Sequence, residues 1–261
     1  MKLTRRVAVG GVQLDELDPS IVIRNIDTGT PDENITAVSR MGGAGQRITG
    51  SHYNSLTVTV AYAIDIRKKR MTNRRDIMDK VKAWAMGGTW LTTNENPRRR
   101  MYIEKVSFSS AGDLYDWTSE YTITFRSYGI PFWQDSSVEP KSKQMTSGSI
   151  KVDVGGNVQT VLNATFENKS GKIINKFKIT AGENTMDFTN LALAAKETLE
   201  ITHTNTGLLR LRIRQTDGST RTAMTRRTGA DDLYVDPGTQ IVTIKAERAG
   251  LLTVSAYGRW L

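Results

Sequence analysis

A Ser–His–Asp arrangement in this chain would have to use one of its two histidines, His52 or His203. His52 lies at the start of a long predicted strand, and His203 lies late in a strand where Leu199 and Ile201 share its parity. We expect both histidines to be ordinary sheet residues. Cysteine is absent, which excludes disulfides and thiolate metal sites and argues against a His-rich transition-metal site.

Acidic side chains gather at two places, and both have the composition of turns. They are Asp15, Glu16 and Asp18, and the pair Asp231 and Asp232. The first group could hold a cation, but it lies beside Pro19 and we interpret it as a solvated turn. The second precedes Leu233 in a turn, where Asp is favoured because its side chain bonds nearby backbone. We find no nucleotide, metal or nucleophile motif. We therefore assign no catalytic, cofactor-binding or metal-binding residue and expect no cofactor and no enzymatic activity.

Two further patterns carry glycine or charge without a defined chemistry. Met41–Gln46 is glycine-rich, but it lacks the Gly-Lys-Ser/Thr and the flanking strand and helix of a phosphate-binding loop. In Leu209–Arg214, three arginines alternate with apolar residues, so their guanidinium groups share one strand face. That face could bind phosphate, carboxylate or an acidic partner, or it could be the solvent side or protected edge of a sheet.

The first half of the chain is organised around one long strand. From Leu56 to Ile66, large apolar side chains alternate with small or β-branched ones, and the second face carries no charge until Asp65. We expect Gly45–Thr49 to lead directly into this strand. Because the second face is uncharged, we expect it to be covered, either by the rest of the fold or by another copy of the chain.

After this strand the hydrophobic period becomes helical. Apolar residues at i, i+4, i+7 and i+8 define one helix face, and they are Ile77, Val81, Trp84 and Ala85. Asp76 in the first turn suits the positive end of the helix dipole. Gly87 and Gly88 are predicted to end the helix as a glycine C-cap.

The rest of the first half reads as shorter strands. The predicted segments are Arg6–Val12, a strand through Ile21, Ile23 and Ile26, an extended excursion over residues 30–50, and the strands Trp90–Thr93, Met101–Ser109 and Glu120–Tyr128. The order of long strand, helix and three strands predicts an α+β domain of antiparallel strands.

The second half is predicted to be all β, as a sandwich or jelly roll. We place the domains at residues 1–141 and 142–261, joined by a linker over residues 129–150 whose Phe132 and Trp133 anchor it to the first domain. The predicted strands are Ser149–Val154, Thr160–Glu167, Lys172–Thr180, Asn184–Phe188, Thr198–Thr204, Gly207–Gln215, Leu233–Val235, Gln240–Ala246 and Leu251–Arg259.

The overall charge and hydropathy restrict the class of partner. The net charge of +9 is spread over both halves with acids interspersed, so we expect no specific nucleic-acid binding. No apolar run approaches the length of a membrane span, and we expect no membrane insertion. The first residues carry an apolar patch too short for a signal-peptide core, so we expect synthesis in the cytoplasm.

Several segments together resemble the distal tail protein (Dit) family of long-tailed, siphovirus-type bacteriophages. They are GQRITG with the long strand LTVTVAYAIDI, the basic loop and helix RRDIMDKVKAWAMGG, the strands WLTT, PRRRMYIEKVSFSS and EYTITFRSYGIPFW, and a β-rich second half ending in LLTVSAYGRWL. The resemblance covers the whole chain in the order of its elements.

The resemblance implies a structural role. Proteins of this family form a hexameric ring at the tail tip that joins the tail tube to the baseplate or tail fibre, with a galectin-like sandwich as the second domain. It implies a homo-hexamer located in the virion at the tail tip, assembled in the bacterial cytoplasm, as part of a phage or prophage. We expect Arg67–Arg70 and Arg98–Arg100 to be exposed loops suited to acidic neighbours, and residues 30–50 to contribute to one subunit interface.

An alternative is a two-domain carbohydrate- or cell-surface-binding protein acting through its C-terminal sandwich. Sugar sites usually need exposed aromatic platforms, and we ascribe most aromatics of the sandwich to core packing. These aromatics are Phe166, Phe177, Phe188, Tyr234, Tyr257 and Trp260. Whether the second domain binds a host-surface glycan or only docks other tail proteins stays open on the sequence.

Overall fold

The computed structural model describes residues 5–39, 46–65, 67, 73–115 and 118–261. It divides into two compact units, one of Met1–Trp133 with Leu261 and the other of Gln134–Trp260. This division corrects the predicted boundary at residues 141/142. Residues 134–141 belong to the second unit because Asp135 hydrogen-bonds Gly258 and Trp260. Phe132 stays with the first unit as expected, with its ring 5.0 Å from that of Tyr53.

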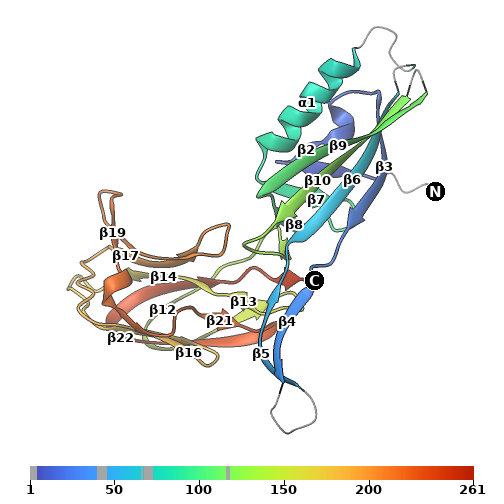
Figure 1. Ribbon diagram of the computed structural model, residues 1–261. Helices are drawn as coiled ribbons and strands as arrows, with labels where there is room; N and C mark the ends of the chain where they lie inside the picture. Colours follow the sequence, from blue (N-terminus) through green and yellow to red (C-terminus); the bar gives the residue numbers. More distant parts are fainter. Residues whose placement is uncertain (1–4, 40–45, 66, 68–72, 116–117) are drawn as a thin grey trace. The chain divides into compact units, whose positions relative to one another are not determined.

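The first unit is built on a four-stranded antiparallel sheet in the order β3 (Ile21–Thr28), β6 (Leu56–Asp65), β10 (Thr118–Ser127) and β9 (Lys105–Tyr115). The predicted alternation of β6 is confirmed, because its larger apolar side chains from Leu56 to Ile64 are all buried. Helix α1 (Arg74–Gly87) lies over this apolar face (Figure 1). Trp84 of α1 meets Phe125 of β10 edge to face, and its Nε1 donates to the Val12 carbonyl at 2.8 Å.

The ends of helix α1 follow from local chemistry. Asn73 is the N-cap, and its side chain accepts the backbone N–H of Arg75 at 3.0 Å. The four predicted apolar residues are its buried ones. The helix ends at the predicted glycines, but the predicted glycine C-cap is wrong. Gly88 is extended, with φ −124°, and not left-handed. Glycine is needed there because a Cβ would lie 2.5 Å from the Val9 side chain and 2.9 Å from the Gly10 nitrogen.

A second sheet of the first unit contains β2 (Val12–Gln13), β1 (Val7–Val9), β7 (Trp90–Thr93) and β8 (Arg99–Tyr102), in that order. The single strand predicted over Arg6–Val12 is wrong, because Gly10 and Gly11 take positive φ and reverse the chain between β1 and β2. The short 3-10 helix η1 (Leu14–Glu16) follows this hairpin.

The strand predicted over Met101–Ser109 is two strands, β8 and β9, which lie in different sheets. Ile103 N–H bonds the Thr89 carbonyl, whereas the next N–H, of Glu104, bonds the Arg126 carbonyl. The chain thus leaves one sheet and enters the other within two residues. The apolar positions change parity at this switch, from Met101 and Ile103 to Val106 and Phe108, and the prediction of a single strand overlooked this shift.

Residues 33–39 and 46–53 form two paired strands, which we call the hairpin of β4 and β5, where the sequence indicated an extended excursion. Strands β4 (Glu33–Ser39) and β5 (Gln46–Tyr53) pair antiparallel as a separate two-stranded sheet. The expected continuous strand from Gly45 is therefore wrong, because Asn54 interrupts it by donating its backbone N–H to the Asp32 carbonyl. Most of the predicted glycine-rich stretch Met41–Gln46 lies outside the described residues.

The second unit is almost entirely antiparallel β. Its main sheet runs β19 (Thr220–Thr222), β18 (Leu209–Arg214), β17 (Thr198–His203), β14 (Asn163–Asn168), β22 (Gly238–Ser255), β15 (Phe177–Ala181), β16 (Asn184–Phe188) and β20 (Arg227–Gly229), and β12 (Lys141–Val154) pairs with β22. Shorter elements are β13 (Thr160–Val161), β21 (Tyr234–Val235), η3 (Met224–Arg226), β11 (Trp133–Asp135) and β23 (Arg259–Trp260).

One long strand, β22, organises this unit. The sequence predicted two strands here, Gln240–Ala246 and Leu251–Arg259, but β12 pairs along both halves, from Val154 opposite Gly238 to Lys141 opposite Val254. On its other side, the first half of β22 pairs with β15 and the second half with β14. Strand β16 has the predicted bounds, while β19 and β20 were not predicted because they are short and polar.

The core of the second unit follows the predicted alternation. The rings of Phe166, Phe177 and Phe188 lie in its centre, with centroids 4.5 Å and 6.1 Å apart along the series. The irregular segment Leu191–Ala195 buries Leu191 and Leu193 completely. These aromatic rings are therefore core residues, and none of the three is available as a surface platform.

Candidate interaction surfaces

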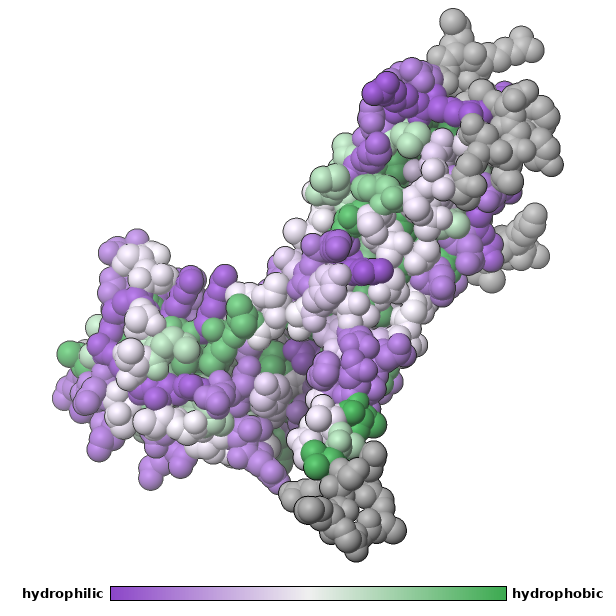
Figure 2. Space-filling model, in the orientation of Figure 1, coloured by the Kyte–Doolittle hydropathy of each residue, from purple (hydrophilic) through white to green (hydrophobic). Residues whose placement is uncertain are grey.

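The strongest exposed apolar feature of the first unit is the hairpin of β4 and β5. Ile35, Val38 and Ile48 are 55%, 55% and 62% exposed, and we call these three residues the hairpin surface. Ile35 and Ile48 share one face, because Ile48 lies opposite Ala37, two residues after Ile35. Hydrophobic surface is visible beside the grey residues of the hairpin in Figure 2. A lone two-stranded ribbon is marginal in water, so this surface is suited to a partner.

The second face of the β3–β6–β10–β9 sheet is also accessible. Thr57, Thr59 and Ala61 of β6 lie opposite Arg126, Thr124 and Thr122 of β10, and the three β6 side chains are half-buried. We call these three positions of β6, two threonines and one alanine, the open face. These three side chains carry no charge, although the exposed Arg126 lies on the same face, and the described elements of the first unit do not cover the three fully. Small β-branched side chains of this kind suit close packing against another protein surface.

The predicted basic loops have a more defined structure than expected. Arg67 is exposed, and its guanidinium forms two hydrogen bonds with the Asp65 carboxylate, at 3.0 and 2.7 Å. This bond raises the pKa of Arg67. Residues 68–70 of the predicted loop lie outside the described residues. Arg98–Arg100 is not simply an exposed loop, because Arg99 begins β8 and the Arg100 guanidinium lies 3.9 Å above the Trp90 ring.

His203 and Asp232 form a buried pair that the sequence did not predict. His203 Nε2 lies 2.8 Å from Asp232 Oδ1, and its Nδ1 lies 2.9 Å from Asn163 Oδ1. Asn163 Oδ1 also accepts the His203 backbone N–H at 3.1 Å, and Asp232 accepts that of Leu233 at 2.7 Å. Every polar group of the pair is therefore used to join β14, β17 and the turn before β21. Among the described residues, no serine hydroxyl bonds either side chain, and these bonds connect neighbouring segments of the unit.

The remaining candidate residues lie apart from one another along the chain. His52 is an exposed sheet residue of β5, opposite Asn34. Asp18 is a turn residue that accepts the Ser20 N–H and hydroxyl, but it is only 2% exposed, so the expectation of a solvated turn is wrong for this carboxylate. Among the described residues, no group of three or more His, Asp or Glu side chains is placed to hold a metal ion.

The arginine face of β18 is exposed, as one of the two sequence interpretations requires. Leu211 and Ile213 are buried while Arg210, Arg212 and Arg214 are exposed. Arg214 pairs with Glu200 of the neighbouring strand at 2.9 Å. One of the three guanidinium groups is thus already neutralised across the sheet, which favours a solvated sheet face over an anion site.

A different arginine, Arg259, is packed inside the second unit. Burial lowers the pKa of its guanidinium, while Tyr234 and Asp232 act in the opposite direction. The Arg259 carbonyl accepts the Asn157 N–H at 2.9 Å and the Val158 N–H at 3.3 Å, so β23 is tied to the body of the unit. None of the helices in the described part of the chain has the length and apolar content needed to cross a bilayer.

The comparisons with known proteins agree on one fold. No protein-family model matches the chain, and no curated protein matches it by sequence. Among solved structures, the crystal structure of SPP1 Dit (gp 19.1), described as a paradigm of hub adsorption apparatus in Gram-positive infecting phages, aligns with a TM-score of 0.67. The alignment covers 98% of this chain and 99% of that chain, at 13% sequence identity.

Two structures of the phage p2 baseplate in its activated conformation, one with Sr and one with Ca, also align. Each has a TM-score of 0.47 and 8% identity, covering 96% or 97% of this chain and 97% or 98% of the other. The argument for the fold rests on the SPP1 Dit alignment, which runs through both units. The resemblance read from the sequence is confirmed at this level: the chain has the fold of the phage distal tail protein SPP1 Dit.

Proposed function

We propose that this protein is a structural component of a phage or prophage tail tip. In this proposal it forms a hexameric ring that joins the tail tube to the baseplate or tail fibre, and it acts without enzymatic activity. The observation that carries the proposal is the fold shared with SPP1 Dit along 98% of the chain. A tail-tip location in the virion, after assembly in the bacterial cytoplasm, follows from the same proposal.

The surfaces of the first unit support ring formation. A closed ring of identical subunits needs two different patches on each subunit, because its contacts are head-to-tail. The hairpin surface and the open face are two such patches, since the first consists of exposed apolar side chains on a two-stranded ribbon and the second of small, half-buried side chains of β6. We propose that the hairpin of one subunit packs on its neighbour and thereby covers Ile35 and Ile48.

We propose that the second unit is a galectin-like sandwich that docks other tail proteins. Its three phenylalanine rings lie in the core, and its exposed aromatic surface is limited mainly to Tyr234, which is 41% exposed. A neutral host glycan would need a stacking platform of several rings. The poor supply of such rings supports docking over recognition of a neutral sugar.

The ring is tested by the mass of the protein in solution, measured by light scattering behind a sizing column over a range of protein concentrations. We expect a species near six times 29.0 kDa, or a concentration-dependent approach to it. Replacing both Ile35 and Ile48 by serine should remove that species. A matched control is Ile173→Ser, which changes an isoleucine that is 56% exposed in the second unit and should leave the mass unchanged.

Two results would contradict the ring. The first is a monomer at every concentration and salt condition for the wild-type chain. The second is an oligomer that the Ile35→Ser/Ile48→Ser variant leaves intact, which would exclude the hairpin surface from the interface. Circular dichroism of both variants separates a lost interface from a lost fold, because only unfolding changes the β signal.

A further inference from the structure

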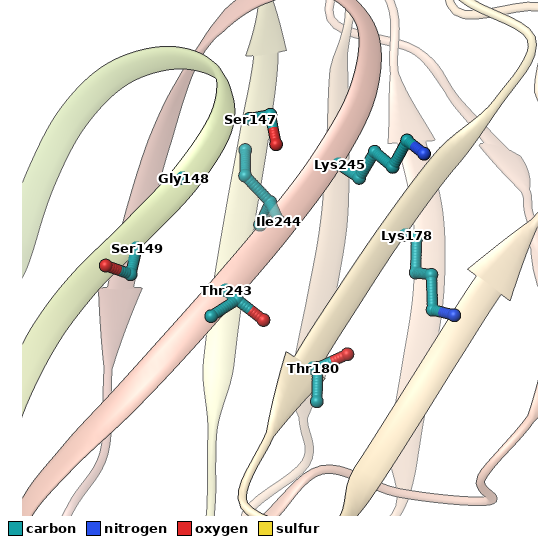
Figure 3. A pocket seen from close by; sticks show the side chains of 8 residues that line it. All are labelled: Ser147, Gly148, Ser149, Lys178, Thr180, Thr243, Ile244 and Lys245. Carbon is teal, nitrogen blue, oxygen red and sulfur yellow. The ribbon is translucent and has the colours of Figure 1, made fainter.

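A shallow hollow of about 490 Å³ lies on the outer face of the second unit. It is formed by three neighbouring strands, β12, β22 and β15, and it is shown from close by in Figure 3. The register of these strands places its side chains in two parallel rows. The first row is Ser147, Lys245 and Lys178, and the second is Ser149, Thr243 and Thr180.

The first row sets two like charges directly opposite each other. Lys178 of β15 and Lys245 of β22 are cross-strand partners, and both are exposed on the same face (Figure 3). Like charges in such a pair repel and destabilise a sheet. Neither ammonium group forms a hydrogen bond or an ion pair with any residue that the structure describes. The pair therefore lacks a counter-charge, and an anion between the two groups would supply it.

The carboxylates nearest in register do not neutralise the pair. Asp187 lies opposite Lys178 on β16 but forms no ion pair with it. Glu247, two residues beyond Lys245, accepts the Asn175 backbone N–H at 2.8 Å. A third ammonium group, that of Lys143, donates to the Ser149 carbonyl at 3.2 Å, at the end of the hydroxyl row. The electrostatic balance of the hollow is thus positive.

The second row supplies hydroxyl groups beside this charge. Ser149, Thr243 and Thr180 stand side by side on adjacent strands, and the Thr180 hydroxyl already bonds that of Thr185 at 2.9 Å. Hydroxyls both donate and accept, so they match the hydroxyl groups of a sugar. No aromatic side chain lines the hollow, which removes the stacking surface that a neutral sugar needs. Recognition here must come from charge and hydrogen bonds.

A protein segment is a poorer occupant of this surface. Strands β22 and β15 are already paired on both sides, so a peptide could extend the sheet only at β12, which pairs with β22 alone among the described strands. The hollow itself is lined by no aromatic side chain, and its one large apolar residue, Ile244, is buried in the core, so it offers no anchor of the kind on which protein interfaces depend. We propose that the hollow binds an oxyanion carried by a sugar, either a phosphorylated or a carboxylated saccharide. The oxyanion lies between Lys178 and Lys245, and the sugar hydroxyls lie along the threonine row.

The test is a calorimetric titration of the full chain at constant ionic strength with glucose 6-phosphate, glucuronate, inorganic phosphate and glucose. We expect saturable binding of glucose 6-phosphate or glucuronate, weaker binding of phosphate alone, and none of glucose. The Lys178→Gln/Lys245→Gln variant should bind the charged sugar about tenfold more weakly, since it loses two charge-assisted contacts. Thr243→Val should weaken binding of the sugar phosphate but not of phosphate.

The control is Lys80→Gln/Lys172→Gln, which makes the same change of charge at exposed positions on other elements. It should bind as the wild type does. Three results would overturn the proposal: no saturable binding of either charged sugar, an equal loss in the control, or binding of poly-glutamate in place of the sugars. Removing the lysine pair should not lower the melting temperature, because it relieves repulsion, so lost binding can be separated from lost fold. The inference concerns the second unit alone and does not depend on the ring.

Discussion

The carboxylate of Asp135 accepts the indole Nε1–H of Trp260 at 2.9 Å, across 125 positions of the chain. Its other oxygen accepts the Gly258 N–H at 3.1 Å, and the Asp135 N–H donates to the Gly258 carbonyl at 3.0 Å. A carboxylate that binds both an indole and a backbone N–H closes the second unit by joining its first residues to its last. The sequence interpretation treated the same residues as a linker.

Asp135→Ala should therefore destabilise the second unit by about 1–3 kcal/mol, the usual cost of leaving buried hydrogen-bond donors without an acceptor. The measurement is urea unfolding with hydrogen exchange read by mass spectrometry, which assigns the loss to peptides of residues 134–260. Glu139→Ala is the control in the same segment, because Glu139 is 84% exposed and its ion pair with Lys141 is 3.5 Å long. An equal loss in both variants would contradict the closing role of Asp135.

The two glycines at the end of α1 should respond in opposite directions to alanine. Gly88→Ala should destabilise the first unit, because the new Cβ meets the Val9 side chain and the Gly10 backbone. Gly87→Ala should stabilise it by about 0.5–1 kcal/mol, since nothing lies within 4 Å of the new methyl group and alanine favours the helix. Thermal unfolding of the two variants checks the pair. Similar effects for both would mean that close approach does not govern residue choice at Gly88.

Tyr62 should make the first unit sensitive to alkaline pH. Burial raises the pKa of this phenol, with a smaller effect of Tyr121 in the same direction. Between the unfolded and folded pKa values the unfolded chain binds fewer protons, so stability falls as pH rises above about 10. Tyr62→Phe should remove this slope. Unfolding free energies between pH 8 and about 11 test it, and parallel curves for wild type and variant would show that another group is responsible.

Breaking the His203–Asp232 pair should strongly destabilise the second unit. His203→Ala removes the hydrogen bond between the imidazole Nε2 and the Asp232 carboxylate, whose side chain is only 11% exposed and keeps the Leu233 N–H as a donor. We expect a loss of about 1–3 kcal/mol, the usual cost of leaving a buried hydrogen-bonding group without its partner. His52→Ala changes the exposed histidine of β5 and should alter stability by less than about 0.5 kcal/mol. Equal effects would indicate that the pair contributes little to folding.

Local periodicity was sufficient to predict the elements that form the first unit's core. The alternation of β6 and the helical spacing of α1 each follow from which side chains must leave water, and both are confirmed residue by residue. Of the six aromatic residues of the second half, the same reasoning holds for Phe166, Phe177 and Phe188, which are buried, but not for Tyr234, which is 41% exposed. Hydrophobic burial constrains the residue type at every position of an element, so the sequence contains a repeated apolar pattern from which the element can be predicted.

The sequence by itself determined the β-rich order of elements, the division into two units and the absence of cysteine chemistry. Only the tertiary structure decided where the chain changes partner: the switch of sheets between Ile103 and Glu104, the separate hairpin of β4 and β5, and the continuity of β22. It alone brought Lys178 to Lys245 and His203 to Asp232. Strand pairing depends on backbone hydrogen bonds, which are the same for every residue type, so partners distant in the chain leave no local pattern to read.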